Sequence, residues 1–308
     1  MLLIGTTEGG FLTPEDGIEH ADRTLESGRV NRVRAFGDVV FAATGSGLFR
    51  SEDGATTWRD LGVPRREVFG VLESPDGESL YAGTHPAHLF VSTDGGESWS
   101  ERAGLREVPS YDTWRTPRHR DEGRIVSLGT HPDASDRLVA GVEVGGVLVS
   151  DDRGVTWSER VDGLEPDVHH VLVRGSEEYV VSTGDGLYRT RDAGRSWTRL
   201  DDDLDRSYFV GATVAGGRLY TAAATPPPAW DGELGPDAVL FESTDDGDTL
   251  EAVPSPVGPD AVVSAWAAAE GGEDVFAATY GGHVLRRRAG TWTSIGSLPA
   301  EIHSIEVV

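Results

Sequence analysis

Short apolar runs, rich in β-branched and aromatic residues, recur along the whole chain between polar segments that contain glycine or aspartate. One series reads "LLIGT", "VVFAAT", "LYAGT", "LVAGV", "YVVST", "LYTAA" and "VFAAT". A second run follows each after a short loop, as in "GGFLT" or "GLYRT", and a third lies upstream, as in "VNRVRAF" or "VFGVLES". Runs of this length bounded by turn residues are typical of β-strands. The pattern predicts an all-β protein with almost no helix.

A polar motif of the form Ser/Thr-x-Asp-x-Gly-x-Thr/Ser-Trp follows the second run of most repeats. Complete copies occupy 92–99, 150–157 and 190–197; altered copies occupy 51–58 and 243–250; weaker remnants are "TPEDG" at 13–17 and "RRRAGTW" at 286–292. Successive aspartates are 41 residues apart between Asp53 and Asp94 and 40 apart between Asp152 and Asp192. A period of about 40 residues with four strands is typical of propeller blades. We therefore predict one domain over 1–308, a seven-bladed β-propeller of four-stranded antiparallel blades.

The two ends of the chain complete one blade. The N-terminus begins at what would be a second strand, and the last run, "IHSIEVV", has the pattern of a first strand. Pairing of 302–307 with 2–6 would close the propeller and protect its strand edges.

The aspartate motif is expected to lock the turn between strands three and four. The aspartate can accept hydrogen bonds from its own turn, glycine permits positive φ, and tryptophan fills the space between strands. Calcium binding is the alternative, but "DDRG" and "RDAG" provide few oxygen ligands. The residues assigned this structural role are Asp53, Trp58, Asp94, Trp99, Asp152, Trp157, Asp192, Trp197 and Asp245.

The charge of the chain is strongly negative. The 308 residues include 52 acidic and 27 basic side chains, giving a net charge of −25, with no lysine and no cysteine. Self-repulsion of this size is screened at molar salt, so we expect a halophilic, cytoplasmic protein of an acidic proteome in a high-salt cytosol. The composition excludes disulfides and thiolate metal sites and argues against nucleic acid as a partner. No apolar run approaches the length of a membrane span, and no cofactor is predicted.

The repeated motif resembles the Asp-box, or BNR, repeat of sialidases, tandem-propeller glucanases, sortilin-type receptors and photosystem II assembly-factor-like propellers. The resemblance covers nearly the whole chain and implies a β-propeller. It implies chemistry poorly, because the box is structural in those families and a fold does not fix a function. A sialidase-like site would need an arginine triad and a tyrosine–glutamate pair. Such a site usually opens with a Phe/Tyr-Arg-Ile-Pro motif on the first inner strand, and the nearest approach to that motif is "NRVRAF" around Arg32 and Arg34. Tyr280 has no evident glutamate partner in the sequence.

Two insertions mark the face on which a ligand or partner would bind. They cover 102–124, between a fourth and a first strand, and 222–238, between a second and a third strand. Loops of this length are usually functional or disordered. Guanidinium groups pair with carboxylates and stack on aromatic rings, so an anion-binding patch and local salt bridging both remain open. The candidate binding residues are Arg32, Arg34, Arg65, Arg66, Tyr111, Trp114, Arg115, Arg118, Arg120, Arg124, Trp230 and Tyr280.

Histidines provide a second signal on the same face. Converging imidazoles can hold a transition metal, and hydrogen-bonded loop histidines are the alternative. The candidates are His85, His88, His169, His283 and His303. We favour a non-catalytic binding or scaffolding propeller that recognises a protein, an anionic small molecule or a glycan. The alternatives are a glycoside hydrolase, sialidase- or glucanase-like, and a metal-dependent propeller enzyme.

Overall fold

The computed structural model describes residues 1–115, 120–227, 235–269 and 271–308. In this part of the chain the regular structure consists of seven four-stranded antiparallel sheets and two short 3-10 helices, η1 (Ala103–Glu107) and η2 (Tyr111–Thr113). The fold is the all-β, seven-bladed β-propeller that the repeats predict. No helix in the described ranges is long and apolar enough to span a membrane.

The chain divides into two compact units, and each is described by itself. Unit 1 comprises Met1–Ala42, Ser51–Trp58 and Leu200–Val308; unit 2 comprises Ala43–Arg50 and Arg59–Arg199. The strands of one sheet belong to both units: β4 (Val30–Phe36), β5 (Val39–Thr44), β6 (Gly47–Ser51) and β7 (Arg59–Asp60).

Unit 1 contains three complete sheets, in each of which the strands follow the predicted order. The first is β28 (Ile302–Val307), β1 (Leu2–Thr6), β2 (Gly9–Thr13) and β3 (Asp22–Leu25). The second is β20 (Tyr208–Ala215), β21 (Arg218–Ala224), β22 (Val239–Ser243) and β23 (Glu251–Val253). The third is β24 (Val263–Ala268), β25 (Val275–Thr279), β26 (His283–Arg288) and β27 (Thr291–Ser297).

Unit 2 also contains three complete sheets. The first is β8 (Val68–Glu73), β9 (Leu80–Thr84), β10 (Leu89–Ser92) and β11 (Ser100–Glu101). The second is β12 (Arg124–His131), β13 (Ala134–Glu143), β14 (Gly146–Ser150) and β15 (Ser158–Glu159). The third is β16 (Val168–Val173), β17 (Tyr179–Thr183), β18 (Gly186–Thr190) and β19 (Thr198–Arg199).

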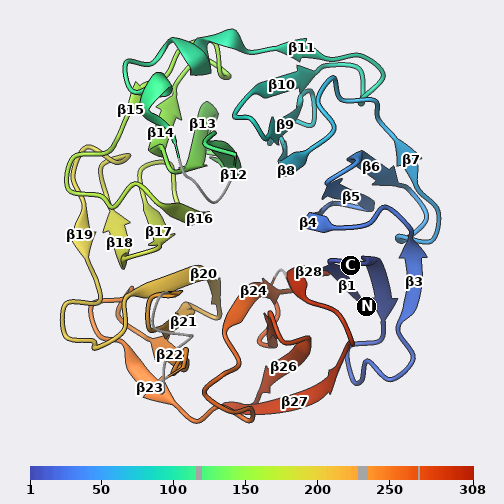
Figure 1. The fold of residues 1–308 in the computed structure, drawn as a ribbon, viewed down its shortest axis with the longest axis vertical. Coiled ribbons are helices and arrows are strands. Elements are labelled where there is room, and N and C mark those ends of the chain that lie inside the picture. The colour runs from blue at the N-terminus through green and yellow to red at the C-terminus, as the bar shows by residue number, and fades with distance from the viewer. Residues whose placement is uncertain (116–119, 228–234, 270) are drawn as a thin grey trace. The chain divides into compact units, whose positions relative to one another are not determined.

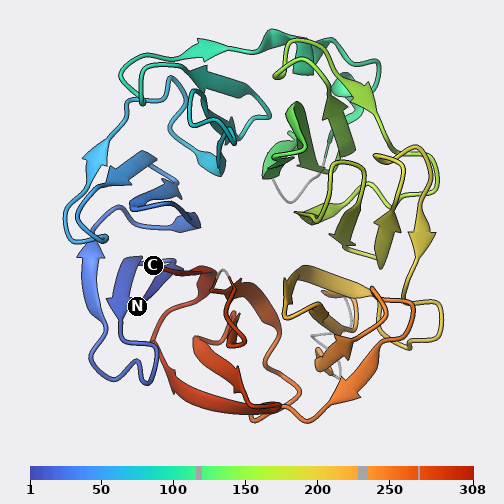
Figure 2. The ribbon, with the colours of Figure 1, turned by 180° about the vertical axis from the view of Figure 1, so that it is seen from behind.

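The C-terminal strand closes the N-terminal sheet as predicted. Strand β28 pairs antiparallel with β1, with Leu2 opposite Val307 and Ile4 opposite Ile305. Figures 1 and 2 show the two chain ends together beside these strands. The hydroxyl of Ser304 accepts a hydrogen bond from the backbone N–H of Val33 on β4 at 3.0 Å, so β28 also contacts the next strand of unit 1.

Neighbouring sheets pack closely because their facing strands are small or apolar. In unit 2 the first strands β8, β12 and β16 contact one another in turn. Strand β9 is buried at all five positions. A Cβ added at Gly83 of β9 would lie 2.6 Å from Cγ2 of Ile125 on β12. Strand β9 is therefore buried along its whole length rather than on alternate positions, because both of its faces are covered.

The Asp-box turns have the structural role that the sequence predicts. In the turn at 92–98, Oδ1 of Asp94 accepts hydrogen bonds from the Ser92 hydroxyl at 2.7 Å and the Ser98 N–H at 2.9 Å, and Oδ2 accepts from the Ser98 hydroxyl at 2.6 Å. The Ser92 hydroxyl accepts the N–H of Gly96 at 2.8 Å, and Gly95 and Gly96 both have positive φ. The boxes at Asp53, Asp152, Asp192 and Asp245 repeat the bonds to the preceding hydroxyl and the following N–H.

The box tryptophans are half-buried, and some join neighbouring sheets. In unit 2 the indole N–H of Trp99 donates to the Leu61 carbonyl at 2.8 Å, and that of Trp197 donates to the Arg160 carbonyl at 3.0 Å. Trp157 instead donates within its own turn, to the Gly154 carbonyl at 3.1 Å. In unit 1, Trp58 donates to the Thr24 hydroxyl at 3.5 Å, at the limit of a hydrogen bond. Each box thus locks its own turn, and Trp99 and Trp197 also bond to the carbonyl of a residue that follows the fourth strand of the preceding sheet.

Removing the charge of one box should change stability in a pH-dependent way. The hydrogen bonds from the Ser98 hydroxyl and N–H lower the pKa of Asp94 to about 2, against about 3.9 in an unfolded chain. A carboxyl group whose pKa is lower in the folded protein than in the unfolded chain stabilises the fold at pH values above the unfolded pKa. This contribution is lost as the pH falls from about 4 to about 2. Asp94→Asn should therefore lower the urea midpoint at pH 6, and the difference from the wild type should shrink toward pH 2. A difference that does not vary with pH would refute the assignment.

Candidate functional site

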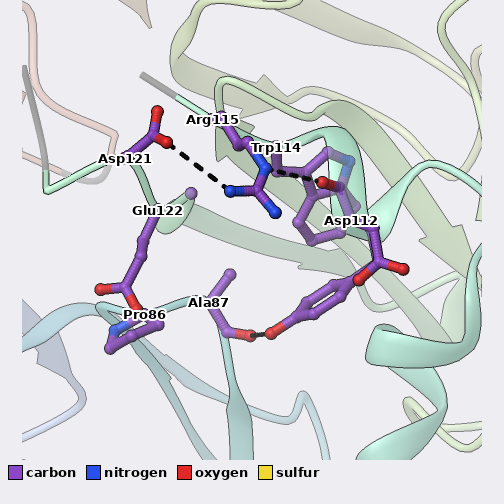
Figure 3. Close-up of a pocket in the computed structure, with 9 residues that line it drawn as sticks. Pro86, Ala87, Asp112, Trp114, Arg115, Asp121 and Glu122 are labelled. Carbon is purple, nitrogen blue, oxygen red and sulfur yellow. Dashed lines mark hydrogen bonds and ion pairs between the residues drawn. The ribbon is translucent and has the colours of Figure 1, made fainter. Parts of the chain in front are cut away.

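The predicted insertion of unit 2 folds onto the connection between β9 and β10. It leaves β11, forms η1 and η2, and enters β12. The Ala87 N–H donates to the Gly123 carbonyl at 2.9 Å, and the Tyr111 hydroxyl donates to the Ala87 carbonyl at 3.4 Å. The Ser110 N–H donates to Glu159 Oε1 at 2.9 Å, which ties the insertion to β15 as well. Segments far apart in sequence are thereby held around one hollow, shown in Figure 3.

We call this hollow the insertion pocket. Its volume is about 220 Å3. It is lined by Pro86, Ala87, Tyr111, Asp112, Trp114, Arg115, Asp121, Glu122 and Gly123. This small concavity is thus lined by three carboxylates, one guanidinium and two aromatic side chains.

Trp114 forms the base of the insertion pocket. Its side chain is only 4% exposed and belongs to the apolar core of unit 2. The indole N–H donates to the Ser110 hydroxyl at 2.8 Å, and the Tyr111 ring lies 5.0 Å from it at 60°. A Cβ added at Gly123 or Gly145 would come within 2.9 Å of Trp114, so both positions need glycine. The tryptophan expected to bind a ligand at the surface is mainly a core residue that supports Tyr111.

The polar wall of the pocket is built by one exposed turn and by η2. Arg115 lies 3.6 Å from Asp121, and its Nε donates to the Asp112 carbonyl at 3.0 Å. In Figure 3, Asp121 and Glu122 lie on one side of the hollow and Asp112 lies on the opposite side, with Arg115 between Asp121 and Asp112. Arg120 and Asp121 both have positive φ, of 56° and 61°. Non-glycine residues in this conformation are strained, and such strain clusters at functional sites.

A second, more open hollow adjoins the first, and we call it the arginine pocket. Its volume is about 450 Å3. It is lined by Pro64, Arg65, Arg66, Glu67, His85, Pro86, Arg120 and Glu122. Pro86 and Glu122 line both pockets, so the two lie side by side.

Most of the predicted basic patch is neutralised by carboxylates. Arg120 donates from both terminal nitrogens to Glu67, and this contact, with a smaller one from His85, lowers the pKa of the Glu67 carboxyl. Arg66 lies 3.2 Å from Asp60. The salt-bridging interpretation therefore describes these two arginines.

Arg124, also predicted in the patch, lies on β12 and is largely buried. It donates to Glu143 Oε2 at 2.9 and 2.6 Å and lies 4.7 Å above the Phe69 ring. Arg65 differs from the others, because it has no hydrogen-bond or ion-pair partner among the described residues. Arg65 is close enough to Tyr111 and His88 for its charge to favour a lower pKa at both.

The remaining predicted binding residues lie in unit 1 or outside the described ranges. Arg34 lies 3.5 Å from Glu306. Burial, together with the neighbouring Arg34 charge, lowers the pKa of Arg32 to about 10, and the charges of Glu306 and Tyr280 oppose this shift. The Tyr280 ring lies 5.9 Å from His303. Unit 1 thus brings Arg32 near both a glutamate and Tyr280, a proximity that the sequence did not reveal. Arg118 and Trp230 fall outside the residues that the structure describes.

The candidate histidines are hydrogen-bonded or ion-paired rather than gathered around one point. His85 lies 3.0 Å from Glu67, and His88 lies 2.6 Å from Glu101, with burial lowering the pKa of His88. The His169 and His303 side chains lie 3.8 Å from Asp167 and Glu301, and the backbone N–H of His283 donates to the Thr279 hydroxyl. Over the described ranges, no three histidine, aspartate or glutamate side chains are placed to hold a metal ion together.

Comparison with known proteins supports the fold and the repeat. The BNR/Asp-box repeat family matches residues 90–101. A xyloglucanase of Hypocrea jecorina (strain QM6a) is 24% identical over 216 residues, which cover 66% of this chain and 24% of the relative. The chain therefore matches about a quarter of that enzyme's length. With the five boxes and seven four-stranded sheets, these matches define a BNR-repeat β-propeller.

Two solved structures show the same fold at low identity. The GH74 xyloglucanase from Xanthomonas campestris has a TM-score of 0.67 and 15% identity, covering 99% of this chain and 52% of its own. The structure of YCF48 bound to D1 peptide has a TM-score of 0.57 and 19% identity, covering 83% of this chain and 77% of its own. At these identities the likeness establishes the fold alone.

Sequence reasoning missed the pocket carboxylates. The salt-bridging alternative makes Asp112, Asp121 and Glu122 ion-pair partners of the arginines. Among the described residues, only Asp121 of these three pairs with an arginine through its side chain, with Arg115. Among 52 acidic residues no signal distinguishes them before folding. The aromatic residues Tyr111 and Trp114 were the useful signal, since both line the pocket.

Proposed function

We propose that this chain is a glycoside hydrolase-like propeller that binds an oligosaccharide in the insertion pocket and cleaves a glycosidic bond there. The observation that carries the proposal is the combination of aromatic surface and carboxylates in one hollow. A sugar ring presents apolar C–H faces and a rim of hydroxyl groups. Binding sites for small molecules pair an apolar lining with a few placed polar groups, and this pocket has both.

The apolar part of the pocket suits the face of a sugar. Tyr111 and Pro86 both line the pocket, and the Trp114 ring packs against Tyr111. At about 220 Å3 the hollow is smaller than the roughly 300–1,000 Å3 of sites for drug-sized ligands. It therefore has room for one sugar ring, and the rest of a chain would lie in the adjoining arginine pocket.

The polar part of the pocket suits hydrolysis. Cleavage of a glycosidic bond generally needs two carboxyl groups that flank the bond, one as acid and one as base or nucleophile. Asp112 and Glu122 stand on opposite sides of the hollow (Figure 3). Asp121 is held by Arg115 and positions that guanidinium toward the pocket. We assign the flanking pair to Asp112 and Glu122.

The relatives favour this function over the non-catalytic scaffold that the sequence suggested. The matched relative is a xyloglucanase, and structures of GH74 enzymes share the fold. We therefore take a β-linked glucan of the xyloglucan type as the first substrate class to test.

The test is hydrolysis of xyloglucan oligosaccharides by the purified chain, followed by release of reducing ends, with binding measured by calorimetry. Glu122→Gln and Asp112→Asn should each reduce turnover by about 100-fold or more, since each removes a proton donor or acceptor, while binding changes little. Glu107→Gln is the matched control, because Glu107 is an exposed carboxylate of the same insertion that does not line the pocket. If neither pocket variant reduced turnover, the assignment of Asp112 and Glu122 as the flanking pair would be contradicted. If the chain bound no saccharide, the proposed function would be contradicted.

A further inference from the structure

We infer that the insertion pocket accepts neutral β-glucans but that the preferred oligosaccharide also carries a carboxylate, as a uronic acid residue does, and that the arginine pocket receives this group on Arg65. The inference rests on the proposed function and specifies its substrate class. Its structural basis is that the two pockets adjoin and share Pro86 and Glu122 in their walls. A sugar seated against Tyr111 would place its neighbour in the chain at the arginine pocket.

Among the residues that the structure describes, the arginine pocket offers one guanidinium that no carboxylate neutralises. Arg120 is bound by Glu67, and Arg66 is paired with Asp60. Arg65 has no such partner among the described residues, and it is half-buried rather than extended into solvent. A guanidinium in this setting can bind a carboxylate through two parallel N–H bonds.

The charge of the whole chain makes a local arginine necessary for such a ligand. With a net charge of −25, the general field of the protein repels anions. Only guanidinium groups at the point of contact can reverse this repulsion. Because Glu67 and Glu122 also line the arginine pocket, a doubly charged phosphate would be repelled more strongly than a singly charged carboxylate. The balance of charges therefore fits a monoanion.

The experiment compares two disaccharides that differ in one group, cellobiose and its uronic acid form, in which a carboxylate replaces the terminal hydroxymethyl. At low ionic strength we expect the acidic disaccharide to bind the wild type about tenfold more tightly. Arg65→Gln should make the two affinities similar, because it should weaken binding of the acidic disaccharide and leave binding of cellobiose unchanged. Added salt should also weaken binding of the acidic disaccharide alone, because interactions between exposed charges are screened beyond about 10 Å at 0.1 M. Arg59→Gln, which removes an exposed arginine paired with Glu97 outside the pocket, is the control.

A second measurement separates this inference from the proposed function. Free glucuronate is titrated while the guanidinium Nε–H signal of Arg65 is followed by NMR. A shift of that signal, absent with glucose, supports the carboxylate site even if neither disaccharide binds. Equal affinities for the two disaccharides, a preference that survives Arg65→Gln, or no shift with glucuronate would overturn the inference. Arg65-dependent binding of a short acidic peptide, with no response to glucuronate, would overturn it in favour of a protein partner.

Discussion

A chain that ends at Glu301 should not form a stable unit 1. Truncation after Glu301 removes β28, which pairs with all five residues of β1 and carries the buried side chains Ile302 and Ile305. Each isoleucine is worth about 1.5–3 kcal/mol of burial, and the uncovered edge of β1 would expose unpaired backbone groups. The total is comparable with the roughly 5–15 kcal/mol that stabilises a domain. We expect loss of the cooperative thermal transition or aggregation on expression.

Two controls make this truncation informative. A chain that lacks only Val308 keeps every β28–β1 pair and should melt within a few degrees of the wild type. A synthetic peptide of residues 302–308, added to the truncated chain during refolding, should restore the transition. A truncated chain that melts cooperatively at the wild-type temperature without the peptide would show that β28 is dispensable.

Replacing Glu242 by alanine should destabilise unit 1 by about 3–5 kcal/mol. The Glu242 side chain is 6% exposed and accepts hydrogen bonds from Arg287 at 2.6 and 2.9 Å and from the Trp292 indole at 3.0 Å. Arg218 adds an ion pair at 3.3 Å. Without the carboxylate, the largely buried Arg287 would lack its counter-charge, which is a strongly destabilising arrangement. Chemical unfolding of the wild type and the variant measures the difference.

A double variant tests the stated cause. Combining Glu242→Leu with Arg287→Met replaces the pair by apolar groups of similar size, which is often neutral in buried settings. The double variant should therefore recover most of the stability lost in Glu242→Ala. If it is as unstable as the single variant, the loss arises from packing around Trp292 rather than from the unpaired arginine.

The fold could be predicted from the sequence because its signals are local. In each box, the aspartate, the hydroxyl two residues before it and the N–H four residues after it lie within one turn. The closing strand was also predictable, since "IHSIEVV" has the pattern of the other first strands. The turn chemistry and the strand period point to the same structure at every repeat.

The site could be predicted only in part because its contacts join distant segments. Arg120 and Glu67 are separated by 53 residues, and nothing in the sequence around Arg120 identifies that partner. The same holds for Pro86 and Ala87, which meet Tyr111 only because the insertion folds back onto the β9–β10 connection. Arginine and aromatic content located the insertion correctly as a place of interest. It did not distinguish Arg65, which has no ion-pair partner in the described part of the chain, from the arginines that carboxylates neutralise.

The central claim, that the insertion pocket binds a sugar, is tested most directly by a crystal structure of the chain soaked with a xyloglucan oligosaccharide. The account predicts electron density for a sugar ring against Tyr111, with hydroxyl groups within hydrogen-bond distance of Asp112 and Glu122. Well-ordered density for the oligosaccharide elsewhere on the chain, with the insertion pocket containing only water at a saturating concentration, would contradict it.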